Sequence, residues 1–398
     1  MVRLFFSVLM LVATVRLWAV DADAVCRLAE LGFENVQVTT RIDGTVCTAL
    51  EPVSYRGIYH GAAAALRELI GLYPESHRFE LVLLDNLVPQ VVLHASHAEG
   101  IWHIEGDYDC ESVMTAFTGR ASNRSVGKID LTVYPTLSWV NHRLDRLCDY
   151  TVALAPALET SLWKGNRVTL QPVFPVMTNT WRQKPESYIH IGVADIAQQF
   201  ASRDGRWLLS AAAGFFLYDR IGADFRACCH VSSALDLSAE VSYTGDALVR
   251  DGHYDIQTPD RLSFLAKADY YEQQTRLQGS LMAGRFVFGD YGVRADLSRH
   301  FGDYTIGLYG ILTGGEHNAG FHFAIPFGPR RQLRQGRMRL KLPDYFDWEY
   351  SMVSYYEYEE RQMGWPVETR PDENRSAYYW QARHVAQYTE KLLNAEVH

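Results

Sequence analysis

The sequence has no excess of basic residues, few cysteines and no long apolar run beyond its N-terminus. Its 398 residues include 38 Lys and Arg against 47 Asp and Glu, and the formal net charge of −9 argues against a nucleic-acid partner. Past the N-terminus, the longest apolar run covers residues 208–218, which is too short for a membrane-spanning helix. If the protein spans a membrane, we therefore expect it to do so with strands.

The first 22 residues have the pattern of a secretory signal peptide. Arg3 precedes an apolar run over residues 4–13, and small residues follow before Cys26, so we expect residues 1–22 to be removed on export. The residues just before Cys26 lack the leucine of a lipoprotein box, and we predict no lipid anchor.

The six cysteines of an exported chain suggest disulfide bonds. We predict a bond between Cys26 and Cys47. A two-residue turn at 43–44 would place Cys47 opposite Thr40. That position lies on the strand face that a helix at residues 23–32 would cover, which brings Cys26 near. The sequence does not determine how the other four cysteines pair: Cys110, Cys148, Cys228 and Cys229.

Residues 23–110 follow the order helix, two strands, helix, two strands, with an alanine-rich helix expected at residues 57–72. This order predicts a small α+β domain with an antiparallel or mixed sheet, which we place in the periplasm. Residues 94–110 are rich in His, Asp and Glu, but the histidines lack the spacing of a helical zinc pair. We interpret that stretch as a solvated acidic loop. Residues 111–127 have the composition of a linker.

Residues 128–360 repeat runs in which apolar and polar side chains alternate. In the run at 291–297, for example, Val293 falls on an apolar face and Arg294 on a polar one. A soluble sandwich or barrel has this pattern with its apolar face inward, and an outer-membrane barrel has it with its apolar face outward. Most runs approach the 9 to 11 residues of a membrane-spanning strand, which favours an outer-membrane barrel of about twelve antiparallel strands.

Two further runs, at residues 337–342 and 347–360, would add to this count, and the segment 361–398 is expected to be partly helical. The chain does not end in the aromatic strand that many bacterial barrels carry. The fold class predicted is therefore mainly β: an outer-membrane barrel preceded by a small periplasmic α+β domain.

Six charged residues on the polar strand faces are predicted to line the barrel interior. They are Glu240, Lys267, Asp269, Arg285, Arg294 and Asp296. Pairing between neighbouring strands would explain them, and so would a path for a polar or anionic substrate; both explanations can hold together.

We predict no catalytic, cofactor-binding or metal-binding residue. The glycine-rich stretch at 313–320 joins two strands and does not lead into a helix, so it is interpreted as a hairpin loop and not as a phosphate site. A hydrolase site built from Ser138, Asn141 and His142 has no supporting spacing.

Residues 284–327 combine glycine-led and aromatic strands in a particular order. A Gly-Arg-Phe strand starts at 284–286, an Arg precedes a Phe-Gly turn at 299–302, and a Gly-Phe strand closes on Ile-Pro at 325–326. In this order of features the sequence resembles the YjbH-like family of outer-membrane exopolysaccharide proteins, as a short, single-barrel member. Residues 31–56 are similar to the periplasmic module of that family.

The resemblance implies a role in the export or assembly of an extracellular polysaccharide, with no catalytic residues to carry over. We predict a non-enzymatic protein without cofactors, in contact with outer-membrane lipid, a polysaccharide and other proteins of an export machinery. The alternatives are a general porin or uptake channel, and third a barrel enzyme that acts on lipid or glycan.

Overall fold

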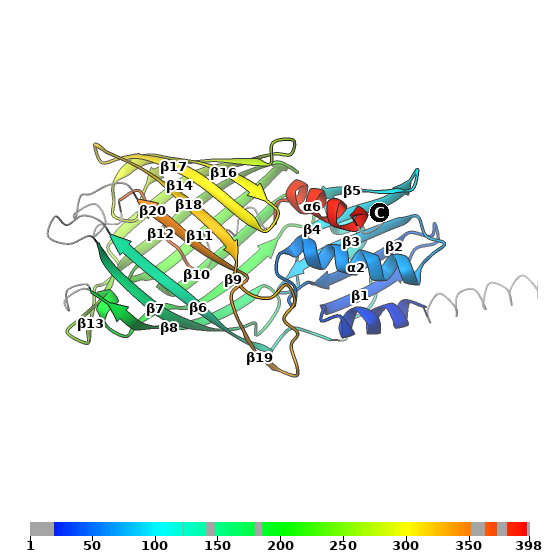
Figure 1. Ribbon diagram of the computed structural model, residues 1–398, viewed down its shortest axis with the longest axis horizontal. Helices are drawn as coiled ribbons and strands as arrows, with labels where there is room; N and C mark the ends of the chain where they lie inside the picture. Colours follow the sequence, from blue (N-terminus) through cyan, green and yellow to red (C-terminus); the bar gives the residue numbers. More distant parts are fainter. Residues whose placement is uncertain are drawn as a thin grey trace, which may run out of the picture.

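The computed structural model consists of two sheets that lie end to end, with a few helices on the smaller one (Figure 1). It describes residues 20–121, 123–140, 148–179, 185–351, 363–371 and 380–395. Residues 1–19 of the predicted signal peptide lie outside this part, and so do Asn141 and His142 of the hydrolase alternative. No helix among the described residues is long and apolar enough to cross a membrane.

Fifteen strands of the described chain form the large sheet. They are β6 (Ile129–Val140), β7 (Asp149–Thr160), β8 (Asn166–Thr178), β9 (His190–Ala201), β10 (Trp207–Phe216), β11 (Arg220–Ser232), β12 (Leu235–Arg250), β13 (His253–Ile256), β14 (Arg261–Glu272), β15 (Leu277–Arg285), β16 (Tyr291–Phe301), β17 (Tyr304–Thr313), β18 (Glu316–Pro326), β19 (Met338–Lys341) and β20 (Tyr345–Ser351). The predicted mainly β character, with many antiparallel strands, is confirmed.

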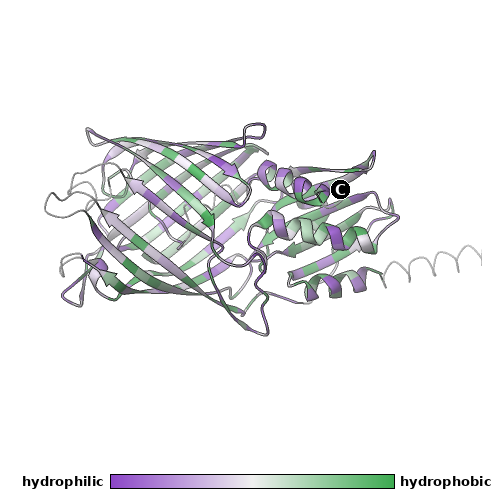
Figure 2. Cartoon of the chain, in the orientation of Figure 1, coloured by the Kyte–Doolittle hydropathy of each residue, from purple (hydrophilic) through white to green (hydrophobic). Residues whose placement is uncertain are grey.

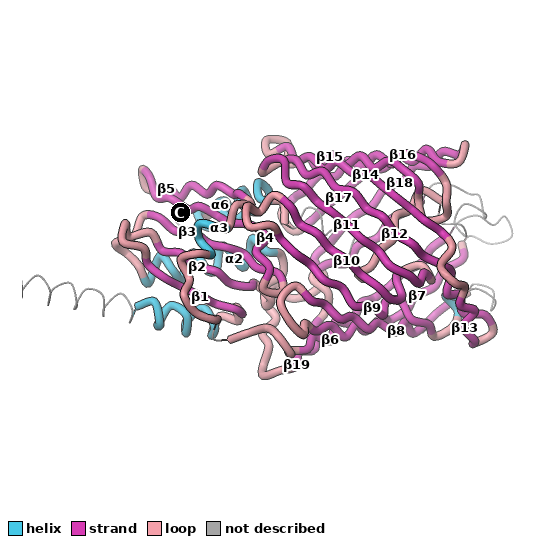
Figure 3. Tube along the Cα trace, turned by 180° about the vertical axis from the view of Figure 1, so that it is seen from behind, coloured by secondary structure: helices cyan, strands magenta, loops and turns pink. Residues whose placement is uncertain are grey.

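Neighbours in sequence pair antiparallel throughout this sheet, except that β12 pairs with both β13 and β14, and β18 pairs with β20. The short strand β19 runs parallel to β6 at the other edge. The sheet curls around, so that β20 comes to lie beside β6 (Figure 1). Figure 3 shows the opposite side of the same sheet, with β9, β10 and β11 side by side. The predicted twelve strands and two further runs account for all of these strands except β13.

The small sheet has the order β1 (Glu34–Thr40), β2 (Val46–Glu51), β3 (Arg78–Asp85), β4 (Val88–Ala98) and β5 (Ile101–Asp107). It is mixed, because β2 and β3 are parallel and the other pairs are antiparallel. A helix at residues 20–30, α2 (Ile58–Leu72) and α6 (Ala382–Asn394) share one apolar core with one face of this sheet. The short helix α3 (Glu111–Met114) packs on the other face. We call this sheet with its helices the small unit.

Residues 94–110, interpreted from the sequence as a solvated loop, instead belong to the hairpin of β4 and β5. Trp102 and Ile104 are buried against the helices, while His103 and Glu105 between and beside them are exposed. This alternation of period two is a strand signal that the acidic composition obscured.

The predicted Cys26–Cys47 disulfide is wrong, since all six cysteines are free thiols. The β1–β2 loop contains three residues, 42–44, and not two, so Cys47 pairs with Thr39 instead of Thr40. A shift of one residue turns a side chain to the other face of a sheet. Cys47 is therefore buried on the α3 side, whereas Cys26 is exposed on the helix that covers the opposite side.

The two faces of the large sheet have an unusual distribution of polarity (Figure 2). On β16, Val293 and Leu297 are 40% and 53% exposed on the outer face, whereas the polar Ser298 and His300 on the inner face are buried. The same alternation recurs on β17, where Ile306 and Leu308 are exposed and Thr305 is buried. The large sheet therefore directs apolar side chains outward and polar side chains inward.

Candidate functional site

The inner face of the large sheet encloses a cavity of about 790 Å³. Because successive side chains of a strand point to opposite faces, each strand contributes every second residue to its wall. On β12, for example, Ser238 and Glu240 line the cavity, and on the neighbouring β14 Lys267 and Asp269 do so. The wall is thus built largely from polar and charged side chains.

The structure brings together five of the six residues that were predicted to line the interior. Glu240, Lys267, Asp269, Arg294 and Asp296 all lie on the cavity wall. Arg285 does not. It pairs in register with Phe264 and Tyr291, whose side chains are exposed on the outer face, and its Nε donates to the Gly289 carbonyl at 3.2 Å. Ser280 and Met282 of the same strand face inward. Because side chains of a strand alternate between its two faces, position 285 faces outward.

Arg294 holds together one group of charges in the cavity. Its Nη2 lies 2.7 Å from Glu349 Oε2 and 3.1 Å from Asp296 Oδ2, and its guanidinium carbon lies 4.3 Å from the centre of the Tyr309 ring. Asp296 Oδ1 is also 2.7 Å from His322 Nε2. Each carboxylate of this group therefore has a charged or hydrogen-bonding partner, as polar groups removed from bulk water require.

A second group of charges centres on two arginines that the sequence analysis did not single out. Arg226 Nε lies 2.9 Å from Asp224 Oδ2 and 3.2 Å from Glu240 Oε2. Arg167 Nη2 lies 3.1 Å from Asp195 Oδ2. The alternation along β8, β9 and β11 places these residues on the inner face, so the sequence does carry a signal for them. Their pairing depends on strand register, which the sequence leaves open.

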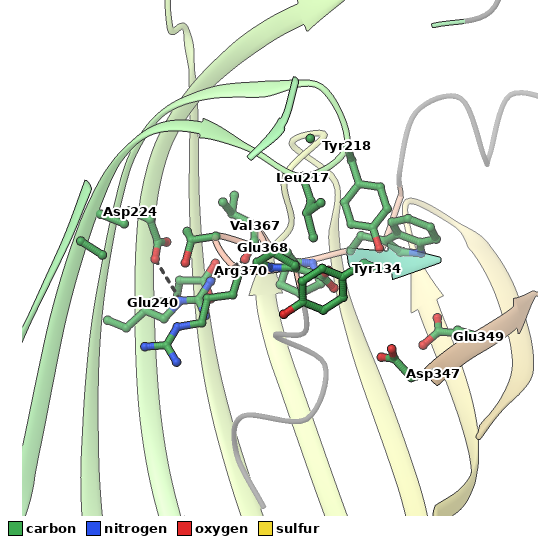
Figure 4. Close-up of a pocket in the computed structure, with 18 of the residues that line it drawn as sticks. Tyr134, Leu217, Tyr218, Asp224, Glu240, Asp347, Glu349, Val367, Glu368 and Arg370 are labelled. Atoms are coloured by element: carbon green, nitrogen blue, oxygen red, sulfur yellow. Dashed lines mark hydrogen bonds and ion pairs between the residues drawn. The ribbon is translucent and has the colours of Figure 1, made fainter. Parts of the chain in front are cut away.

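Residues 363–371, called here the cavity segment, lie inside the cavity and were missed entirely (Figure 4). The Val367 side chain is buried against Ala212, Phe216 and Val287 of the surrounding sheet. Arg226 Nη2 donates to the Val367 carbonyl, and Arg167 Nη2 donates to the Thr369 carbonyl at 3.2 Å. The two arginines thus join the segment to the wall.

The cavity segment begins at the end of the large sheet that is remote from the small unit. There the Gly364 N–H donates to Asp290 Oδ2 at 2.9 Å, and the Leu217 N–H of the β10–β11 turn donates to the Glu368 carbonyl at 3.0 Å. Trp380 still lines the cavity, and the next residue, Gln381, donates to the Ala234 carbonyl at the end that adjoins the small unit. The described residues 363–368 and 380–381 therefore make contacts at opposite ends of the cavity.

The small unit is attached to the large sheet at the β16–β17 turn. Asp303 in that turn lies 2.8 Å from both Arg56 Nη2 and His60 Nε2, and the Tyr59 hydroxyl donates to it at 2.5 Å. Burial alone would raise the pKa of the Asp303 carboxyl, but hydrogen bonds from His60, Tyr59 and Arg56 outweigh burial and hold this pKa well below its usual range. The carboxylate is thereby kept charged as the centre of the contact.

Comparison with known proteins gives little further information. No family model and no curated protein sequence matches the chain. Among solved structures it is similar to OmpTdeltaL8, a loop L8 deletion mutant of OmpT, an outer membrane protein of Vibrio cholerae. The identity is 8%, the match covers 56% of this chain and 92% of that chain, and the TM-score is 0.29. At this level of similarity the match carries no argument about fold or function.

Proposed function

We propose that the protein is an outer-membrane β-barrel with the small unit in the periplasm, and that it supports the export or assembly of an extracellular polysaccharide. The observation that carries the membrane assignment is the inverted polarity of the large sheet. Large apolar side chains such as Leu281, Leu297 and Leu308 stand exposed on the outer face, while the charged groups face the cavity. Such a contiguous apolar surface is unfavourable in water and is what a lipid bilayer requires.

The resemblance of residues 284–327 and 31–56 to the YjbH-like family supports the polysaccharide part of the proposal. The cavity wall is chemically compatible with it, because paired carboxylates and guanidinium groups can exchange hydrogen bonds with a hydroxyl-rich or acidic polymer. We propose a non-enzymatic role, in which the small unit contacts other proteins of the export machinery.

A general porin is the second candidate, because a polar cavity within a barrel is also what a porin has. The cavity segment argues against an open pore. Its Val367, Glu368 and Thr369 are buried within the cavity, and the wall arginines hold its backbone. We therefore propose a filled barrel, in which any passage of polymer requires the cavity segment to move.

The membrane assignment is tested by labelling two adjacent positions of β16 in protein reconstituted into bilayers. Both variants are made in a chain whose six free cysteines are replaced by serine, so that the fluorophore reports one position. A fluorophore on Leu297→Cys should be quenched by lipid-borne probes, whereas one on Ser298→Cys, which lines the cavity, should not. Equal insensitivity of both positions, or recovery of the protein as a soluble periplasmic monomer, would contradict it.

The polysaccharide role is tested in the native host. Loss of the protein should lower the amount of secreted polymer, and the wild-type chain should restore it. A null strain with normal secretion, together with ion conductance of the reconstituted protein at the level of a porin, would favour the channel instead.

A further inference from the structure

Three potential metal ligands converge at the end of the cavity that adjoins the small unit. Cys228 and His230 lie two residues apart on β11 and so share its inner face. Asp236 on β12 is directly opposite His230 in register. One ligand atom of each residue lies within 4.8 Å of those of the other two. No other group of this kind occurs in the described part of the chain.

The electrostatic surroundings of this cluster favour a cation. Asp236 is directly opposite Asp269 on β14, and the two residues are only 8% and 5% exposed. Like charges placed opposite each other on neighbouring strands repel, and burial strengthens the repulsion. Lys267 Nζ lies 3.1 Å from Asp269 Oδ2, but Asp269 Oδ1 is buried without a hydrogen-bond partner among the described residues. The cluster thus lies beside a buried carboxylate oxygen that a cation would stabilise.

The imidazole of His230 is held in a fixed orientation. Its Nδ1 lies 2.7 Å from Asp236 Oδ1, and the Tyr108 ring stacks on it with the centroids 3.7 Å apart and the planes within 9°. Tyr108 comes from the small unit, and its hydroxyl accepts a hydrogen bond from the Ala382 N–H at the start of α6. A metal ion bound between Nδ1 and Oδ1 would replace this hydrogen bond, while the stacked Tyr108 ring keeps the imidazole in place.

We propose that Cys228, His230 and Asp236 bind a divalent transition metal, with Zn²⁺ as the first choice, and that one coordination position stays open to the cavity. A thiolate, an imidazole and a carboxylate are all common zinc ligands, and bonds of about 2.0–2.3 Å place tetrahedral ligand atoms roughly 3.3–3.8 Å apart. The three ligand atoms therefore reach tetrahedral separations after only small side-chain rotations. All three residues line the cavity, so water or a polar group can complete the site from that side.

The test uses the purified full-length protein in detergent, stripped with a chelator and titrated with Zn²⁺ against a metal indicator. We expect one tight site per chain, with the affinity weakened about tenfold or more in Cys228→Ser and in Asp236→Asn. Cys229→Ser is the matched control. Cys229 is the next residue of β11, but it pairs with Trp207 and Leu237, whose exposed side chains mark the outer face.

A second measurement keeps the proposal testable if a variant fails to fold. Co²⁺ bound to the wild-type protein and to Cys229→Ser should show a thiolate-to-cobalt charge-transfer band, since metal binding displaces the proton of Cys228. The proposal is overturned if the wild-type chain binds no stoichiometric Zn²⁺, if its Co²⁺ complex lacks the thiolate band, or if the Cys228 and Cys229 variants behave alike. None of these results depends on the proposed role in polysaccharide export.

Discussion

Single residues of the large sheet have opposite requirements on its two faces. Leu297 lies near the middle of β16 on the outer face, where the bilayer is expected to be most apolar. We predict that Leu297→Arg destabilises the protein by about 2 to 4 kcal/mol in urea unfolding from lipid vesicles. Val231→Arg is the control, because Val231 is exposed near the end of β11. This substitution should lower the free energy of unfolding by at most about 1 kcal/mol. Equal costs at the two positions would contradict a bilayer around the sheet.

On the inner face of the large sheet, single residues contribute to stability through ion pairs. Arg294 bridges Glu349 and Asp296, so Arg294→Gln leaves two carboxylates without their cation. In a double-mutant cycle of Arg294→Gln with Glu349→Gln, we expect a coupling free energy of about 1 to 3 kcal/mol. The cycle is read from the same unfolding titrations. A coupling near zero would mean that water in the cavity screens the pair.

In the small unit, the buried Glu51 should make stability depend on pH. Burial raises its pKa to about 7, although the Leu87 N–H donates to Oε1 at 2.5 Å. Because the folded-state pKa lies above the unfolded value, the stabilisation is fully present below the unfolded pKa of about 4.3 and is lost as the pH rises through about 7. We predict a loss of about 3 kcal/mol over this window.

Amide hydrogen exchange of residues 46–51 at pH 5 and pH 8, corrected for the intrinsic effect of pH, measures this loss. Glu51→Gln should abolish the pH dependence, whereas Glu30→Gln, at an exposed position, should keep it. A wild-type protein with equal protection at both pH values would refute the prediction.

At the scale of elements, we predict that the cavity segment closes the proposed barrel to ions. Val367 is buried against Ala212, Phe216 and Val287, so Val367→Asp would place an unpaired charge in an apolar contact. We predict that this change displaces the segment and raises conductance in planar bilayers above that of the wild-type protein. Arg370→Gln is the control, because Arg370 lies in the same segment but is only half-buried, and this variant should conduct like the wild type. Conductance unchanged by Val367→Asp would show that the segment does not close the pore.

How far the sequence predicts these elements depends on their periodicity. The long strands were found because each repeats apolar residues at period two over many positions, and even β19 and β20 were anticipated. β13 has only four residues, all exposed, so its alternation of His253 and Asp255 with Tyr254 and Ile256 is too short to indicate a strand. The cavity segment, with Pro366 and Pro371 around Val367, repeats apolar residues at neither the period of a strand nor that of a helix. Its position is set by contacts with distant strands, which a single sequence does not encode locally.

The prediction of site residues from the sequence was limited by the phase and the pairing of the strands. The alternation of polar and apolar residues sufficed to assign Glu240, Lys267 and Asp269 to the inner face. The face on which Arg285 lies could be decided only from which other residues of β15 point inward. One additional loop residue between β1 and β2 reversed the side on which Cys47 lies. Alternation also assigns Cys228, His230 and Asp236 to the inner face, but their convergence required the pairing of β11 with β12, which the sequence alone did not provide.

At the scale of the whole molecule, the two ends of the chain form one core. Helix α6 packs on β5 and α2, and Gly106 on β5 allows its close approach, because a Cβ there would lie 2.3 Å from the Ala382 carbonyl oxygen. We predict that Gly106→Val separates α6 from the sheet, seen as faster amide exchange in residues 382–394. Gly119→Val is the control, since a Cβ at Gly119 would meet nothing within 4 Å. Unchanged exchange in the Gly106 variant would contradict this account of the contact.

The core that α2 and α6 share also constrains the order in which the protein folds. Helix α6 follows the large sheet in the sequence, so synthesis supplies it only after the fifteen described strands of that sheet. Until α6 packs, Leu66 and Leu69 of α2 lack part of their apolar cover. The small unit therefore cannot complete its core before the large sheet has been synthesised, and the docking of α6 is its last folding step.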